Sequence, residues 1–157
     1  MTETERIIDQ LERAQHGDAW HGPSLRELLE GVTAAQAAAH PIPQAHSIWE
    51  LVNHIIAWEQ IALRRLRGEL LVAITDEMSF PPIADTGAPS WQAALRALDE
   101  SNQSLRDAIR RIGDVQLNAT VPGTPYTNYV LLHGVIQHDL YHGGQIAVLR
   151  KFSVPNP

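Results

Sequence analysis

Apolar residues recur every three or four positions along most of this chain, which is the spacing of one face of an α-helix. The pattern covers four long stretches separated by loops rich in proline and glycine. Alternating patterns, which indicate strands, are almost absent, and only Ala119-Thr120-Val121 is expected to be briefly extended. The sequence therefore predicts an all-α protein with long helices over about residues 2–16, 47–67, 90–111 and 127–152.

Local signals support the starts and ends of these helices. Thr2 with Glu5, and Ser47 with Glu50, are capping boxes, in which each side chain bonds the backbone N–H of the other residue. Gly68 follows the second stretch, and helices commonly end before a glycine. A shorter stretch between residues 23 and 39 is rich in turns and carries apolar residues and one more capping box of its own.

The link between the second and third helices is the longest loop of the predicted fold. It covers residues 68–89 and contains Pro81, Pro82 and Pro89. Such a link can cross the whole length of a bundle, so the second and third helices are expected to run parallel. The first and second helices, and the third and fourth, are expected to be antiparallel. The third helix should end at Gly113, and the fourth should stop before Pro155.

The composition narrows the function classes. The 157 residues suit one domain, residues 1–157, with a proper hydrophobic core. The formal net charge is −6, and this acidity argues against nucleic acid or an anionic membrane as the main partner. The chain has no cysteines, which excludes disulfides, thiolate nucleophiles and Cys-containing metal sites. Neither a signal peptide nor an apolar run of membrane-spanning length is evident, so we expect a cytoplasmic protein.

His138 and His142 form the most informative pair of polar residues. They lie one turn apart on the fourth helix, about 40° from each other, on a stripe that is otherwise apolar. Two imidazoles are costly to desolvate there unless something engages their nitrogens, and one metal ion can engage both. The chain has eight histidines, however, and the spacing alone is equally compatible with hydrogen-bonded core residues.

His54 is a third candidate, at the edge of the apolar side of the second helix. The other five histidines fall in or beside predicted loops or point away from the pair. We expect these five to be solvated or locally bonded: His16, His21, His40, His46 and His133.

Competing catalytic motifs fit poorly. His138-Asp139-Leu140-Tyr141-His142 has aspartate where the zincin motif has glutamate, and the shorter side chain would poorly reach a metal-bound water. A carboxylate-bridged di-iron site needs two Glu-x-x-His motifs, which the chain lacks. No G-x-S-x-G, P-loop or G-x-G-x-x-G is present, so nothing indicates a serine hydrolase or a nucleotide site.

Two stretches nevertheless carry a family resemblance. His46-Ser47-Ile48-Trp49-Glu50-Leu51-Val52-Asn53-His54 and His138-Asp139-Leu140-Tyr141-His142-Gly143-Gly144-Gln145-Ile146 resemble the DinB/YfiT-like superfamily. The resemblance implies a four-helix bundle of up-down-down-up topology, usually a homodimer. It also implies a metal site made of one histidine from the second helix and an H-x-x-x-H pair from the fourth, and these positions are His54, His138 and His142. Characterised relatives include thiol-dependent S-transferases and an isomerase, and others are described as metal-dependent hydrolases.

Three neutral imidazoles would leave the ion at least one open coordination position, which is typical of a catalytic site. Imidazole ligands favour a divalent transition metal, with zinc or nickel expected. The leading hypothesis is a metal-dependent thiol S-transferase or hydrolase that acts on a small molecule, with a low-molecular-weight thiol as a candidate partner. The alternative is a metal-binding or stress-response interaction protein without turnover.

No catalytic side chain is assigned from the sequence. Glu50 lies one turn from His54, but its capping box explains it equally well. Asp139 and Gln145 are candidates to orient the histidines, and Tyr141 to line a pocket, but each also has a structural explanation.

The fourth helix is also apolar on the side opposite the histidines, through Leu132, Ile136, Leu140 and Ala147. A helix that is apolar on two sides must be covered on both. We expect a second subunit to supply this cover in a homodimer. The alternative is that residues 23–39 of the same chain cover this face.

Overall fold

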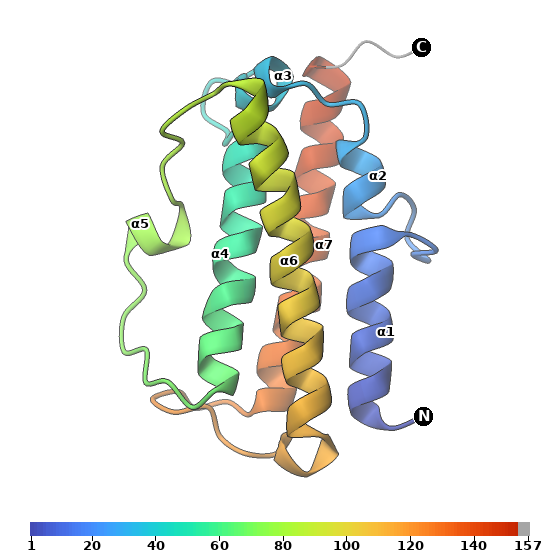
Figure 1. The fold of residues 1–157 in the computed structure, drawn as a ribbon, viewed down its shortest axis with the longest axis vertical. Helices are drawn as coiled ribbons and strands as arrows, with labels where there is room; N and C mark the ends of the chain where they lie inside the picture. Colours follow the sequence, from blue (N-terminus) through green and yellow to red (C-terminus); the bar gives the residue numbers. More distant parts are fainter. Residues whose placement is uncertain (154–157) are drawn as a thin grey trace.

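The computed structural model describes residues 1–153, and its main feature is a bundle of four long α-helices (Figure 1). All four lie close to their predicted positions, so the all-α fold class is confirmed. Pro155, the expected stop of the fourth helix, lies outside the described residues. The long helices are α1 (Glu3–His16), α4 (Ile48–Leu66), α6 (Ala88–Ile112) and α7 (Asn128–Ser153).

Shorter elements lie in the connections between them. The first two fall in the turn-rich stretch, the third in the long link and the last after α6. Within residues 1–153 the expected extended segment forms only an isolated antiparallel bridge, between Thr120 and Thr127. The short elements are α2 (Leu25–Leu29), α3 (Ala34–Ala38), α5 (Asp76–Ser79) and the 3₁₀-helix η1 (Asp114–Gln116).

The predicted helix starts are formed as capping boxes. At α4 the backbone N–H of Glu50 donates to Ser47 Oγ (3.1 Å), and the backbone N–H of Ser47 donates to Glu50 Oε2 (2.7 Å). Thr2 begins α1 in the same way. Helix α6 begins slightly earlier than predicted, because its first turn accommodates Pro89, which needs no backbone donor there.

The long link runs along the outside of the bundle. In Figure 1, α1 and α7 run upward whereas α4 and α6 run downward, so the link must return from the bottom of α4 to the top of α6. On the way α5 packs against α4, and its last residue, Ser79, contacts a side chain of that helix. The link therefore supplies residues that contact α4 from outside the four-helix bundle.

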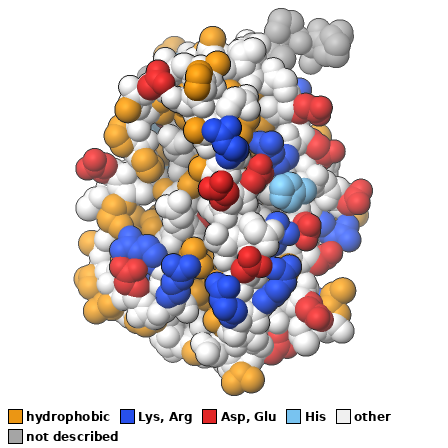
Figure 2. All heavy atoms as spheres, in the orientation of Figure 1, with side chains coloured by type: hydrophobic (Ala, Val, Ile, Leu, Met, Phe, Trp, Pro, Cys, Tyr) orange, Lys and Arg blue, Asp and Glu red, His pale blue; other side chains and the backbone are white. Residues whose placement is uncertain are grey.

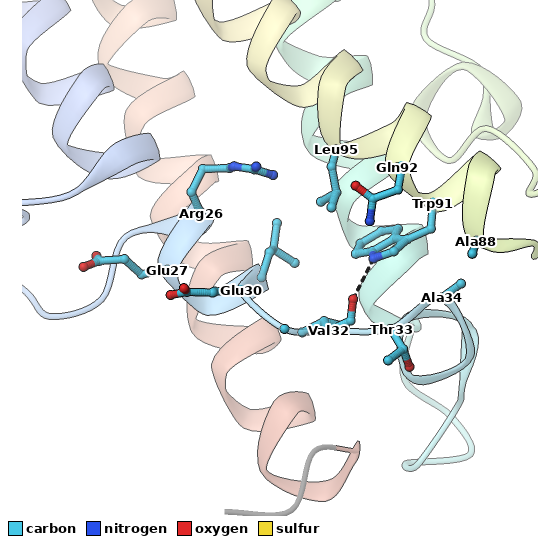
Figure 3. A pocket seen from close by; sticks show the side chains of 12 residues that line it. Arg26, Glu27, Glu30, Val32, Thr33, Ala34, Ala88, Trp91, Gln92 and Leu95 are labelled. Atoms are coloured by element: carbon cyan, nitrogen blue, oxygen red, sulfur yellow. Dashed lines mark hydrogen bonds between the residues drawn. The ribbon is translucent and has the colours of Figure 1, made fainter. Parts of the chain in front are cut away.

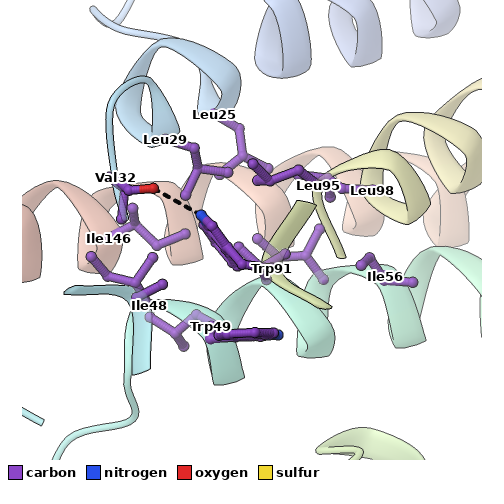
Figure 4. Close-up of a cluster of buried hydrophobic side chains, with 14 of the residues drawn as sticks. Leu25, Leu29, Val32, Ile48, Trp49, Ile56, Trp91, Leu95, Leu98 and Ile146 are labelled. Carbon is purple, nitrogen blue, oxygen red and sulfur yellow. Dashed lines mark hydrogen bonds between the residues drawn. The ribbon is translucent and has the colours of Figure 1, made fainter. Parts of the chain in front are cut away.

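One hydrophobic cluster fills the end of the bundle near α2 and α3 (Figure 4). Trp91 of α6 lies at the centre of this cluster and is only 1% exposed. The centroid of its ring is 5.1 Å from that of Trp49. The indole N–H of Trp91 donates to the carbonyl of Val32 at 2.8 Å. This bond and the surrounding packing tie the segment before α3 to the long helices.

A second cluster fills the other end, where α1 joins α4, α6 and α7. Between the two clusters, the buried positions on α4, α6 and α7 include a set of polar residues. These residues are Glu59, Ser101, Asn102, Arg106 and Asp139.

Elements of the same chain cover the second apolar face of α7. Leu132 and Ile136 are buried in the cluster that includes Ile7 and Leu11 of α1. Helix α2 covers the later part, where the guanidinium of Arg150 donates to backbone carbonyls of α2 at 2.8 Å. The alternative of an intrachain cover is therefore correct, with α1 contributing as well as α2, and this face gives no argument for a dimer.

Charged side chains of both signs are interspersed on the face of the molecule that Figure 2 shows. On α6, charged residues of both signs are exposed, among them Arg96, Glu100 and Arg110. None of the helices in residues 1–153 combines the length and the apolar character needed to cross a lipid bilayer.

Candidate metal centre

The structure brings together the three histidines singled out in the sequence. His54 projects from α4, and His138 and His142 project from α7. The Nε2 atoms of His54 and His138 lie 3.0 Å apart, and one ring nitrogen from each of the three residues falls within 4.8 Å of the others. His54 and His142 are only 6% and 7% exposed, so His54 is more deeply buried than its position at the helix edge predicts.

Helix geometry explains the pair, and helix packing explains the third member. His138 and His142 lie four residues apart, so they project from one side of α7, with ring centroids 4.4 Å apart. His54 reaches them because α4 and α7 pack against each other, which places its ring 4.6 Å from that of His142. The three-histidine cluster thus joins two helices that are distant in the sequence.

Hydrogen bonds fix the orientation of two rings. The Nδ1–H of His54 donates to the backbone carbonyl of Ser79 at 2.6 Å, because that oxygen can only accept. In the same way, the Nδ1–H of His142 donates to Gln145 Oε1 at 2.7 Å; the sequence alone left Gln145 open between orienting a histidine and a structural role. Both bonds leave the Nε2 lone pair free to face the centre of the cluster.

Asp139 stands beside His138, but the contact is longer. His138 Nδ1 and Asp139 Oδ1 are 3.6 Å apart, and within the described residues neither buried atom has a hydrogen-bond partner. This distance is beyond a hydrogen bond. The carboxyl of Asp139 is nevertheless the nearest acidic group to this ring, and a carboxylate–histidine pair is a common arrangement behind metal ligands.

Aromatic side chains cover the cluster. The ring of Phe80, which directly follows α5, stacks on His54 with centroids 3.9 Å apart, and on its other neighbour His46 at 4.0 Å. Trp58 lies 5.8 Å from His138, and its indole N–H donates to Ser79 Oγ. These contacts exclude water from one side of His54.

Burial keeps the three histidines neutral at physiological pH. Desolvation lowers the pKa of His54 to about 4, and it also lowers the pKa of His138 to about 4. Desolvation likewise lowers the pKa of His142, although the hydrogen bond to Gln145 opposes the shift. Neutral imidazole is the form that binds a metal ion.

The donor set fits one divalent ion. In a tetrahedral site, ligand nitrogens about 2.0–2.1 Å from zinc lie roughly 3.3 Å from each other. The 3.0 Å between the Nε2 atoms of His54 and His138 is close to this ligand-to-ligand distance. A ring nitrogen of His142 lies within 4.8 Å of the other two ligand nitrogens. The buried, neutral and convergent nitrogens are therefore compatible with metal binding.

The remaining candidates lie elsewhere. Glu50 serves its capping box and also bonds His40 at 3.0 Å, so within the described chain it has no contact with the cluster. His46 approaches Glu50 at 3.6 Å, and His133 approaches Glu3 at 3.9 Å.

The two histidines not yet mentioned, His16 and His21, are exposed. Local bonding or solvation of these five histidines agrees with the prediction. Tyr141 is 65% exposed and lines a pocket together with His46, and its ring lies 5.0 Å from that of His142.

A mostly apolar pocket of about 280 Å³ opens beside His138, between α4 and α7. We refer to it as the α4/α7 pocket. Sequence reasoning missed its polar members, Arg65 and Tyr126, because they come from different elements. The only available signal was the spacing of His54, Trp58 and Arg65, which places all three on one face of α4. The pocket lining is formed by Trp58, Arg65, Tyr126, Val130, Leu131, Gly134, Val135 and His138.

A larger cavity, of about 670 Å³, lies beside the first turns of α6 (Figure 3). It is lined by residues of α2, the segment before α3 and α6, and it contains no histidine. Its arginine, Arg26, is paired with Asp99 at 3.4 Å. The cavity has no convergent set of reactive groups, so the histidine cluster is the better candidate.

Comparisons with known proteins identify the family and the fold. Residues 19–146 match the family model described as the DinB superfamily. A crystal structure described as the conserved protein of locus from Enterococcus faecalis has the same fold, with a TM-score of 0.74 and 19% sequence identity over 99% of each chain. No curated protein matches the chain in sequence. The family match includes all three histidines.

Proposed function

Because the chain belongs to the DinB superfamily, we propose that it is a metal-dependent enzyme that holds one divalent ion through His54, His138 and His142. The observation that carries this proposal is the convergence of three desolvated, neutral imidazoles beside a pocket. A cluster of three imidazoles is not expected in a purely structural hydrophobic core, because burying its nitrogens costs free energy.

Zinc or nickel is the proposed metal, because imidazole nitrogen suits these ions better than magnesium or calcium. When bound, such an ion supplies a Lewis acid with an open coordination position, which lowers the pKa of a water or thiol that reaches it. Ser79 and Gln145 hold two imidazoles in the ligating tautomer, and Phe80 shields His54 from solvent. This chemistry supports a thiol S-transferase or a hydrolase of small molecules.

Elemental analysis of the purified protein tests the metal site. We expect about one transition-metal ion per chain after supplementation near pH 7.5, and loss of that ion in His54→Ala and His142→Ala. His133→Ala is a matched control, because His133 lies on α7 outside the cluster. A wild-type protein without stoichiometric metal would overturn the proposal.

Turnover is tested separately from binding. The metal-loaded protein is incubated with low-molecular-weight thiols and electrophiles, and with a panel of esters and amides. Consumption of substrate that disappears in His138→Ala supports the enzyme. A fully metallated protein that is inert across the panel would support the rival function, a metal-binding protein without turnover.

We also propose a homodimer, on the basis of family membership alone, since the second apolar face of α7 is already covered. Sedimentation at micromolar concentration is the test. A mass of one chain would contradict this assembly.

A further inference from the structure

Arg65 forms the polar end of the α4/α7 pocket. It lies on the same face of α4 as Trp58 and His54, and its side chain is half-buried. Trp58 and His138 line the same pocket, and their rings are 5.8 Å apart. The pocket therefore connects a guanidinium to the histidine cluster along one groove.

This arginine has no acidic partner among residues 1–153. Its neighbour Arg64 pairs with Glu69, and the buried Arg106 pairs with Glu12 at 2.8 Å. In addition, the Nε of Arg65 is buried without a hydrogen-bond partner in the described chain. A desolvated cationic donor of this kind is costly unless an acceptor engages it.

Tyr126 holds the guanidinium in place. Arg65 Nη1 donates to the Tyr126 hydroxyl at 2.7 Å. Tyr126 is itself fixed, because its backbone carbonyl accepts a bond from the N–H of Val121 at 2.9 Å. One of the five N–H donors of Arg65 is thus committed to positioning, and Nε is buried. The end of the guanidinium formed by Nη1 and Nη2 therefore supplies the donors for a ligand.

The rest of the pocket sets the character of that ligand. Its walls are mainly apolar, through Trp58, Leu131 and Val135, and no acidic residue lines it. In a chain with a net charge of −6, Arg65 is thus a cationic group in a pocket whose lining contains no acid. A volume of about 280 Å³ is just below the range of drug-sized ligand pockets, roughly 300–1,000 Å³, so the ligand must be small.

We propose that the α4/α7 pocket binds a small, mostly apolar molecule through one oxyanion group, which lies against Arg65 while the rest of the molecule leads to His138. The inference rests on the proposed function for the reactive end, and it adds the class of substrate. Arg65 is a binding residue in this scheme, because a guanidinium recognises a carboxylate or a phosphonate with two parallel hydrogen bonds.

Three probes of one shape test the charge requirement. Phenylacetate, benzylphosphonate and the neutral phenylacetamide are titrated by calorimetry, and the Trp58 indole N–H is followed by NMR to locate the bound probe. Each titration is performed on zinc-loaded and on chelator-treated protein, because an oxyanion can also bind zinc directly.

We expect at least one oxyanion probe to bind roughly 10–100-fold more tightly than the amide, with or without zinc, since a charge-assisted bond is worth that much. The tighter of the two oxyanions identifies a carboxylate or a phosphonate-like group. Arg65→Gln should remove the preference, Arg65→Lys should restore part of it, and the adjacent Arg64→Gln should leave it unchanged. Thermal melts of each variant establish that it folds.

Equal binding of the amide and both oxyanions, or a preference that survives in folded Arg65→Gln, would overturn the inference. So would a preference that exists only with zinc, because the metal would then be the anion site. Each of these results leaves the metal content of the protein intact and so does not touch the proposed function. Conversely, absence of metal in the wild-type protein overturns the proposed function, whatever the probes show.

Discussion

Gln145 shows how a single residue can decide the ligating form of a histidine. Its side-chain oxygen accepts from His142 Nδ1 at 2.7 Å, one turn further along α7. This bond sets the tautomer and the plane of the ring, so the free Nε2 points at the other two histidines. Gln145 therefore acts on the site through His142.

Replacing Gln145 by leucine is expected to weaken zinc binding about 10–100-fold, because the His142 ring loses its acceptor. Competitive zinc titration at pH 7.5 measures the effect. Gln137→Leu is the matched control, since Gln137 is an exposed glutamine on the same helix. Unchanged affinity in Gln145→Leu would mean that packing alone orients the ring.

Glu59 illustrates the cost of a buried carboxyl group. It is 1% exposed and accepts a hydrogen bond from Asn102 at 2.8 Å and another from Ser101. Burial raises its pKa well above the usual value of 4.5, and the nearby Asp139 raises it further. Burial likewise raises the pKa of Asp139. The folded protein therefore binds a proton at this pair that the unfolded chain releases.

The sign of the pH dependence follows from that proton. Above pH 4.5 the unfolded Glu59 is ionised while the folded one keeps its proton, so rising pH removes stability until the folded group also ionises. Glu59→Gln lacks this loss, and its stability relative to the wild type should increase as the pH rises. Urea unfolding of both proteins at several pH values between 5 and 9 measures the difference. A constant difference would contradict a raised pKa of Glu59.

Among the elements, the link between α4 and α6 contributes most to the site without being part of the bundle. Ser79 supplies the carbonyl that orients His54, and Phe80 stacks on the same ring. From its residues alone, this link has only a topological role, because its length is the one feature that can be interpreted. Nothing in the local sequence indicates which face of α4 it covers.

Phe80→Ala is expected to raise the pKa of His54 from about 4 toward 6.5, because the ring that shields it from water is removed. If the pKa returned fully to 6.5, competition with protons would weaken zinc binding about fourfold at pH 6 and much less at pH 7.5. NMR titration of His54 in the metal-free protein and zinc titration at both pH values measure the two effects. Val72→Ala, at an exposed position of the same link, should change neither; an unchanged pKa in Phe80→Ala would show that other groups desolvate His54.

At the scale of the whole molecule, the histidine cluster joins α4 to α7, which lie 84 residues apart at His54 and His138. An ion bound to both helices stabilises the folded chain but not the unfolded one. Zinc at 100 times its dissociation constant should add about 2.7 kcal/mol to the free energy of unfolding. For a chain of this size the melting temperature should then rise by roughly 5–10 °C.

Calorimetric melts with and without zinc test this coupling. His54→Ala should lose the shift, because the ion then has ligands from α7 alone, whereas His133→Ala should retain it. A shift of equal size in His54→Ala would place the bound zinc elsewhere on the molecule.

Local interactions explain what the sequence by itself determined. Helix starts such as Ser47 with Glu50, and the spacing of His138 and His142, depend on residues within one turn of each other, so a periodic pattern is enough to predict them. The all-α class follows from the same periodicity, and the family resemblance points to His54.

Only the tertiary structure decided how distant residues meet. The register of α4 against α7 sets the approach of His54, and the path of the link brings Ser79 onto it. The same packing leaves Arg65 without an acidic partner in residues 1–153, and it places α1 over the second apolar face of α7. These contacts depend on how whole helices fit together, which the periodicity of any single helix does not specify.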